Sequence, residues 1–174
     1  EAKKAISEAR LANPEDTSLT LTEANLYLET KDFDMYKKLI AEVLEKNPND
    51  VELIFNLGVL SANAKNTADA EKYYKKVIEI NPKYINAYIN LAAMKLENEK
   101  VIIDEMNKLG TSAKDMKRYD ELKKKREELF KATIPYLEKA VELDSKNSDV
   151  SKTLLGVYSA LEMTAEYKAL KAKM

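Results

Sequence analysis

Residues 51–82 read VELIFNLGVLSANAKNTADAEKYYKKVIEINP, and apolar residues recur every three or four positions on both sides of a polar break at residues 65–67. This spacing predicts two helices joined by a tight turn. Thr67 is placed to accept from the first free amides of the second helix. That helix must end at Asn81, because Pro82 lacks an amide hydrogen and disfavours the α region for the residue before it.

The same Asn-Pro dipeptide closes three successive segments, with prolines at positions 14, 48 and 82. Both intervals between these prolines are 34 residues long. A fixed period of this length indicates stacked helical pairs, each burying an apolar face against its neighbours. The sequence therefore predicts an all-α repeat protein without a β-sheet.

Residues 51–82 resemble one repeat of the tetratricopeptide-repeat family. Counted from Val51 as position one, Gly58 at position eight and Ala70 at position twenty are the family's small residues. The other matches are Leu57, Tyr74 and Pro82, and the departures are Ile54 and Ser61, where the family usually has tryptophan and tyrosine. The resemblance implies antiparallel helix pairs in a right-handed superhelical solenoid. The two small residues would let the paired helices approach closely.

The repeat pattern predicts a single solenoid domain over residues 1–174, divided into five segments. They are a half repeat at 1–14, repeat 1 at 15–48, repeat 2 at 49–82, repeat 3 at 83–147 with an insertion at 99–130, and repeat 4 at 148–174. The half repeat resembles a second helix without its first, so we expect its apolar face to be uncovered or packed against another copy. In repeat 1, Asp32 is expected to cap the second helix, and Tyr36 replaces the small residue at position twenty, which predicts different local packing.

The insertion is predicted to be helical, because apolar spacing continues through it. We expect two long helices, 85–109 and 113–144, in an antiparallel hairpin that reaches roughly 20 Å beyond the stack. Gly110 is expected to end the first helix in a left-handed conformation, and Ser112 to cap the second. The residues predicted to seal the hairpin are Ile102, Met106, Leu109, Met116, Tyr119 and Leu122.

Three further expectations concern the C-terminal part of the chain. Pro135 lies inside the second long helix, where unbroken apolar spacing predicts a kink rather than a break. Repeat 4 has two possible registers, with either Leu155 or Gly156 at position eight. Thr164 is expected to cap a short final helix.

The composition argues against catalysis. The chain has no histidine, no cysteine and a formal net charge of −1. The usual proton shuttles and thiol nucleophiles are therefore absent, and we expect no catalytic residue, no cofactor and no metal site. No apolar run approaches the ~18 residues of a membrane span. The lack of cysteine fits a bacterial cell envelope as well as a cytosol.

The one concentrated charge feature is residues 117–126, which read KRYDELKKKR and hold six basic residues in ten. Such a run is typical of an anion or nucleic-acid patch. The alternative is the solvated face of a helix, neutralised by acidic neighbours. These neighbours are Asp120, Glu121, Glu127 and Glu128. We favour the solvated face and expect no nucleic-acid partner.

The resemblance also implies a concave groove, lined by the first helix of each repeat, that binds a peptide or protein segment. The groove positions include Leu21, Asn25, Leu28, Phe55, Asn56, Val59, Asn63, Asn86, Ile89 and Asn90. Asn56 and Asn90 are 34 residues apart, and such a ladder could pair with a peptide backbone or hold neighbouring repeats together. Leu21, Phe55 and Ile89 would form an apolar strip beside it, and we expect none of the lysine clamps by which some family members bind a terminal carboxylate.

The function predicted from these features is a non-catalytic protein–protein interaction scaffold. The alternative is a structural element that self-associates through the hairpin or through the uncovered first helix.

Overall fold

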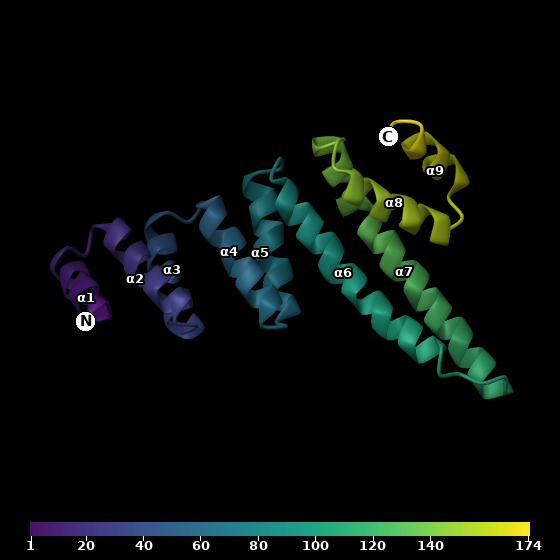
Figure 1. Ribbon diagram of the computed structural model, residues 1–174, viewed down its shortest axis with the longest axis horizontal. Coiled ribbons are helices and arrows are strands. Elements are labelled where there is room, and N and C mark those ends of the chain that lie inside the picture. The colour runs from purple at the N-terminus through teal and green to yellow at the C-terminus, as the bar shows by residue number, and fades with distance from the viewer. The chain divides into compact units, whose positions relative to one another are not determined.

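The computed structural model describes the backbone of residues 1–174 and every side chain except that of Ala2. Along this described backbone, 80% of the residues are helical and no strand occurs, so the all-α prediction is confirmed. Nine helices follow one another in this part of the chain (Figure 1): α1 (Ala2–Ala12), α2 (Thr17–Glu29), α3 (Phe33–Lys46), α4 (Val51–Asn63), α5 (Thr67–Ile80), α6 (Ile85–Met106), α7 (Ala113–Leu143), α8 (Ser148–Ala160) and α9 (Thr164–Lys171).

The helices form two compact units, Glu1–Ile80 and Asn81–Met174, and each is described by itself. In unit 1, α2 packs against α3 and α4 against α5, while α1 packs on α2. The buried core of this unit contains Ala24, Tyr36, Leu39, Ile40, Leu57 and Leu60. Tyr36 fills this core at the position where the family has a small residue, which confirms the expected change in local packing. The single continuous solenoid and its handedness stay predictions.

The close approach of α4 and α5 depends on Gly58. A Cβ atom at this position would lie 2.6 Å from Cε1 of Tyr74, closer than carbon atoms can pack. Ala70 is fully buried beside them. The two small residues therefore have the packing role that the sequence predicted.

Side chains at the helix starts satisfy the first free amides. The Asp32 carboxylate accepts from the Met35 amide at 3.3 Å, as predicted. The predicted cap at Thr67 is wrong, because Thr67 is already the first helical residue and the Asn66 side chain accepts from the Asp69 amide instead. Thr164 is likewise the first residue of α9, which begins without a side-chain cap.

The turn between the two helices of a repeat has a left-handed residue that is not glycine. Lys31 has φ 59°, Lys65 has φ 61° and Glu162 has φ 57°. After Lys65, the Asn66 amide donates to the Ser61 carbonyl at 2.9 Å, and the same pattern follows the other two residues. These bonds satisfy carbonyls that the end of the first helix leaves free.

Unit 2 is built around a long hairpin of α6 and α7, which pack along one another in antiparallel directions (Figure 1). The hairpin has 22 residues in α6 and 31 in α7. Pro135 lies inside α7 and the helix continues through it, so the prediction that the proline does not break the helix is confirmed. The kink at Pro135 stays a prediction. The helices α8 and α9 follow α7, with α8 packed against α7 and α9 against α8. Ser112 caps α7 as predicted, because its hydroxyl accepts from the Asp115 amide at 3.1 Å.

The end of the hairpin differs from the prediction. The helix α6 ends at Met106 rather than at residue 109, and no glycine has a positive φ, so the left-handed stop at Gly110 is wrong. Ile102 and Leu122 are buried as expected, but Met116 is 62% exposed and Tyr119 is 45% exposed.

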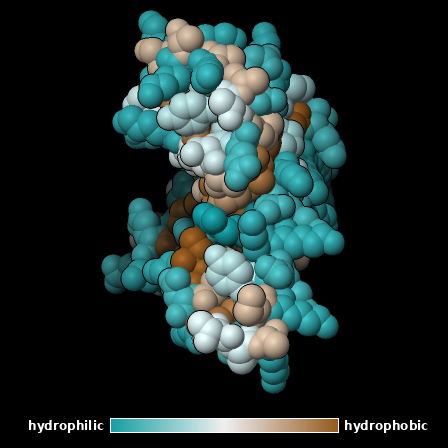
Figure 2. All heavy atoms as spheres, turned by 90° about the vertical axis from the view of Figure 1, so that its right-hand side faces the viewer, coloured by the Kyte–Doolittle hydropathy of each residue, from teal (hydrophilic) through white to brown (hydrophobic). Residues whose placement is uncertain are grey.

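The exposure of Met116 follows from the unequal lengths of the two helices. Arg118 of α7 pairs with Glu105 at the end of α6, so residues 113–117 extend past the last turn of α6. Met116 therefore has no α6 side chain opposite it. Figure 2 shows pale brown side chains at its lower end, the end at which the α6–α7 turn lies in Figure 1.

The caps also decide the register of repeat 4. Asn147 caps α8 as Asp50 caps α4, and Glu162 occupies the left-handed position of Lys65. Asn147 lies 97 residues after Asp50, and Glu162 lies 97 residues after Lys65. The same separation from Gly58, the residue at position eight of repeat 2, puts Leu155 at position eight of repeat 4. Gly156 is exposed, and an added Cβ atom there would meet nothing within 4 Å, unlike one at Gly58.

Candidate binding pocket

A pocket of about 600 Å³ opens in unit 1 between the end of α2, the start of α3 and one face of α4. Its apolar walls include Leu28 and Phe33, which are 38% and 42% exposed. Tyr36 and Leu60, which are buried, also line it. Burial raises the pKa of the Tyr36 hydroxyl, so this group stays protonated at neutral pH.

Two predicted groove residues lie in this pocket. Asn56 and Asn63 are both exposed on α4 and are seven residues apart, so they stand two turns apart on the same face of the helix. Val59 lies between them and lines the same pocket. The structure therefore joins amide groups, which both donate and accept hydrogen bonds, with apolar side chains of α2 and α3.

Two lysines in the pocket were missed by the sequence analysis. Lys31 lies in the turn after α2 and Lys37 lies in the first turns of α3. Among the described side chains that line the pocket there is no carboxylate. The pocket is therefore positively charged. The sequence signal that could have indicated this charge is the pair of lysines on either side of Phe33.

The other predicted groove residues have different surroundings. Leu21 is half-buried and packs against the core of unit 1, and the Phe55 ring lies 5.6 Å from the Tyr74 ring, centroid to centroid. Asn25 is exposed outside the pocket lining. In unit 2, α6 carries Asn86, which is exposed, and Ile89 and Asn90, which are half-buried. Contact between these residues and a ligand stays a prediction.

An ion-pair network fastens α1 to the rest of unit 1. Nε of Arg10 donates to Glu23 at 2.5 Å, and Nη1 of Arg10 donates to Glu42 at 3.0 Å. Glu23 is only 2% exposed, so its pairing with Arg10 offsets part of the cost of burying the carboxylate. The three members of this network lie on three helices, so no local sequence pattern links them.

The basic run at residues 117–126 is partly neutralised across the hairpin. Arg126 pairs with Glu99 at 2.5 Å, and Arg118 pairs with Glu105 at 2.6 Å and with Glu121 at 3.2 Å. Glu121 was among the predicted neutralising residues, whereas Glu99 and Glu105 come from the facing helix. The two arginines therefore hold the hairpin together, and the lysines of the run point to solvent.

The described residues contain no group of three or more acidic, histidine or cysteine side chains that could hold a metal ion. None of the described helices is both long enough and apolar enough to cross a lipid bilayer.

Comparisons with known proteins identify the fold. Residues 51–84 match the family model of the tetratricopeptide repeat. A solved structure from Bacteroides ovatus ATCC 8483 aligns with a TM-score of 0.66 at 17% identity over 93% of this chain and 89% of its own. A structure of MamA aligns with a TM-score of 0.63 at 14% identity over 99% of this chain and 84% of its own. The comparison with curated protein sequences finds no match.

The class of the protein follows from the fold, which is an all-α helical repeat. Within that class, residues 51–84 match one tetratricopeptide repeat, and the two helices that follow it, α6 and α7, form a long hairpin. The resemblance seen in the sequence is confirmed.

Proposed function

We propose that the protein is a non-catalytic interaction scaffold and that the pocket of unit 1 binds a segment of a protein partner. The observation that carries the proposal is the pocket of about 600 Å³, in which exposed apolar side chains lie beside asparagine side chains and lysines. The similar structure from Bacteroides ovatus is described as a proposed protein-binding protein, which supports the same class of function.

The chemistry of the pocket selects a ligand with both apolar and acidic groups. Leu28 and Phe33 offer apolar area that an anchoring side chain would bury. The amides of Asn56 and Asn63 can pair with the backbone of an extended peptide, whatever its sequence. Lys31 and Lys37 favour a carboxylate next to the anchor, and because they are close to solvent they act mainly on association rate.

The test begins with a displayed library of random peptides selected on the whole chain, followed by calorimetric titration of one selected peptide. We expect Asn56→Ala combined with Asn63→Ala to weaken binding by about tenfold or more. The melting temperature should stay unchanged, because both side chains are exposed. The matched control is Asn98→Ala with Asn107→Ala, two exposed asparagines of unit 2.

Two results would argue against this pocket. One is unchanged affinity in the Asn56→Ala, Asn63→Ala variant. The other is selection of peptides without acidic residues, together with affinity that does not fall as salt is raised.

The hairpin end favours a second candidate function, self-association. Met116 and Tyr119 are exposed there, and apolar side chains in such positions mark interaction surfaces when they lie together. Light scattering over a range of concentrations tests this candidate. A larger species that disappears in the Met116→Ser, Tyr119→Ser variant would support it, and a monomer at all concentrations would exclude it.

A further inference from the structure

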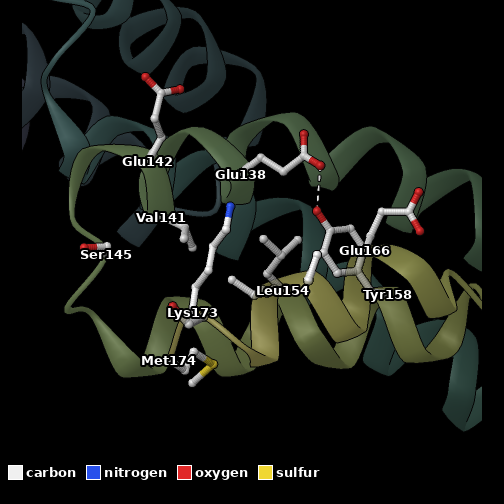
Figure 3. Close-up of a pocket in the computed structure, with 12 residues that line it drawn as sticks. Glu138, Val141, Glu142, Ser145, Leu154, Tyr158, Glu166, Lys173 and Met174 are labelled. Carbon is white, nitrogen blue, oxygen red and sulfur yellow. Dashed lines mark hydrogen bonds between the residues drawn. The ribbon is translucent and has the colours of Figure 1, made fainter.

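A second pocket, of about 430 Å³, lies in unit 2 between the C-terminal half of α7, α8 and α9 (Figure 3). Its apolar lining includes Val141, Leu154 and Leu170. Its carboxylates are Glu138 on α7, Glu142 on the next turn of α7 and Glu166 on α9. None of the residues that line it belongs to the pocket of unit 1, so the two sites are independent.

The pocket is open because its side chains are smaller than their counterparts in unit 1. With the separation of 97 residues found for the caps, Ser151 corresponds to Ile54, Val141 to Leu44 and Leu170 to Tyr73. Ile54 is 1% exposed, and both Leu44 and Tyr73 pack against the core of unit 1. Replacement of these three side chains by smaller ones leaves space between the helices of unit 2.

Ser151 gives the pocket an unused polar group. Its side chain is 1% exposed and its hydroxyl oxygen has no hydrogen-bond partner among the described residues. A buried hydroxyl without a partner is unfavourable, and a ligand that reaches it would supply the missing bond. The equivalent isoleucine in unit 1 has no such requirement.

The charges on the pocket are mainly negative. The Tyr158 hydroxyl donates to Oε1 of Glu138 at 2.6 Å, which holds this carboxylate at the pocket (Figure 3). Burial, and then this hydrogen bond, raises the pKa of Tyr158, so the hydroxyl remains a donor. Glu142 also pairs with Lys139 on its own helix at 2.6 Å, whereas Glu138 and Glu166 have no lysine or arginine partner in the described residues.

Lys173 shows what the pocket can hold. It follows the end of α9, and its side chain extends along the pocket with the ammonium group toward α7 (Figure 3). The aliphatic part of a lysine can lie on apolar surface while its charge remains beside carboxylates. Lys173 thus occupies the place that a basic side chain of another molecule would take.

We propose that this pocket binds a partner peptide through a lysine or arginine side chain that is flanked by an apolar residue. The basic group takes the place of the Lys173 ammonium group beside α7, in the pocket that Glu138, Glu142 and Glu166 line, and the apolar residue covers Val141 and Leu170. The partner chemistry is opposite to that of the unit 1 pocket, which carries lysines and no carboxylate.

The experiment uses the full chain and the peptide acetyl-Leu-Lys-Leu-amide as the probe, observed through the methyl NMR signals of Val141, Leu154 and Leu170. The control peptide has an acetylated lysine, which has nearly the same length and no charge. We expect the basic peptide to shift these methyl signals in a saturable way. The dissociation constant of the acetylated peptide, measured from the same signals, should be at least about threefold higher. Equal binding of both peptides would overturn the proposal.

Variants locate the site. Glu138→Gln keeps an acceptor for the Tyr158 hydroxyl. Combined with Glu166→Gln, it should weaken binding of the basic peptide by about three- to tenfold. Lys173→Ala should strengthen binding of the peptide, because the competing ammonium group is gone. Ser151→Ile should abolish binding by filling the space as in unit 1. The matched control, Glu127→Gln with Glu128→Gln, changes the same number of charges on α7 outside the pocket and should leave affinity unchanged. Equal effects of the two double variants, or full binding to Ser151→Ile, would refute the assignment.

Discussion

Two helical glycines, Gly58 in unit 1 and Gly156 in unit 2, differ in how much space surrounds them. Gly58 faces Tyr74 so closely that a methyl group would overlap the ring, whereas nothing lies within 4 Å of a Cβ atom at Gly156. We expect Gly58→Ala to lower the free energy of unfolding by roughly 1–2 kcal/mol, because overpacking exceeds the gain in helix propensity. Gly156→Ala should raise it by up to about 1 kcal/mol. Urea unfolding of both variants measures the difference, and stabilisation by Gly58→Ala would contradict the close packing.

Lys65 illustrates a residue whose backbone conformation is costly. It has φ 61°, a conformation that glycine adopts without strain. Lys65→Gly should therefore raise the free energy of unfolding by about 0.5–1 kcal/mol, even though glycine is normally destabilising. Lys72→Gly, inside α5, is the control and should lower it by about 1 kcal/mol. Thermal unfolding of the two variants should shift in opposite directions.

At the scale of single residues, the sequence predicts short-range features such as helix caps well, and the exact first residue of a helix less well. Asp32 and Ser112 were identified as caps, because a cap depends on neighbours two or three positions away. Thr67 was displaced by one residue, since Asn66 and Thr67 are adjacent polar residues and either could begin the helix. Thr164 was displaced because α9 begins after Met163, whose side chain makes no capping hydrogen bond. The left-handed lysines were missed, because nothing in their side chains signals a positive φ.

At the scale of elements, we interpret the hairpin of α6 and α7 as an extension of one repeat. We expect that replacing residues 99–130 with Lys-Asn-Thr, the turn found at residues 65–67, leaves α6 to α9 folded. In unit 2, α6 packs against α7 and α8 packs against the same α7, and helix pairs in a repeat protein need only their near neighbours. Circular dichroism and urea unfolding of the shortened chain test this. Loss of a cooperative transition would show that the distal hairpin is part of the core of unit 2.

The hairpin also shows why apolar residues are not always buried. The apolar pattern correctly predicted two long helices, because Ile102, Leu122 and Phe130 follow a helical period and are buried. It placed Met116 and Tyr119 inside, although both are exposed. The pattern gives the face of a helix, but it does not give the length of the partner helix opposite.

At the scale of the whole molecule, the repeat period was enough to predict the fold. In a repeat protein each pair contacts only near neighbours, so a local pattern carries most of the architecture. The pockets needed the structure. The unit 1 pocket combines Asn56 and Asn63, which the family pattern indicated, with Lys31 and Lys37 from a turn that no groove pattern includes. The unit 2 pocket depends on three side chains being small at the same time.

The two compact units should be separable. We expect a fragment of residues 1–80 and a fragment of residues 81–174 each to remain helical in isolation, because most packing contacts lie within one unit or the other. Circular dichroism with urea titration of each fragment measures this. A fragment that is unfolded in buffer but folds on addition of the other would show that the units depend on one another for stability.

The short connection at residues 107–112 has a consequence for the covalent integrity of the chain. It joins α6 to α7 at the exposed end of the hairpin, and Lys108 lies in it. Exposed loop tips are preferred sites of proteolytic nicking. Brief trypsin treatment should cleave after Lys108 first. The two products should still elute together in gel filtration, because Ile102 and Leu122 and the pair of Arg126 with Glu99 join α6 to α7 without the peptide bond. The same loop is therefore the place to split the protein into two halves that reassemble, or to open new termini for a circular permutant.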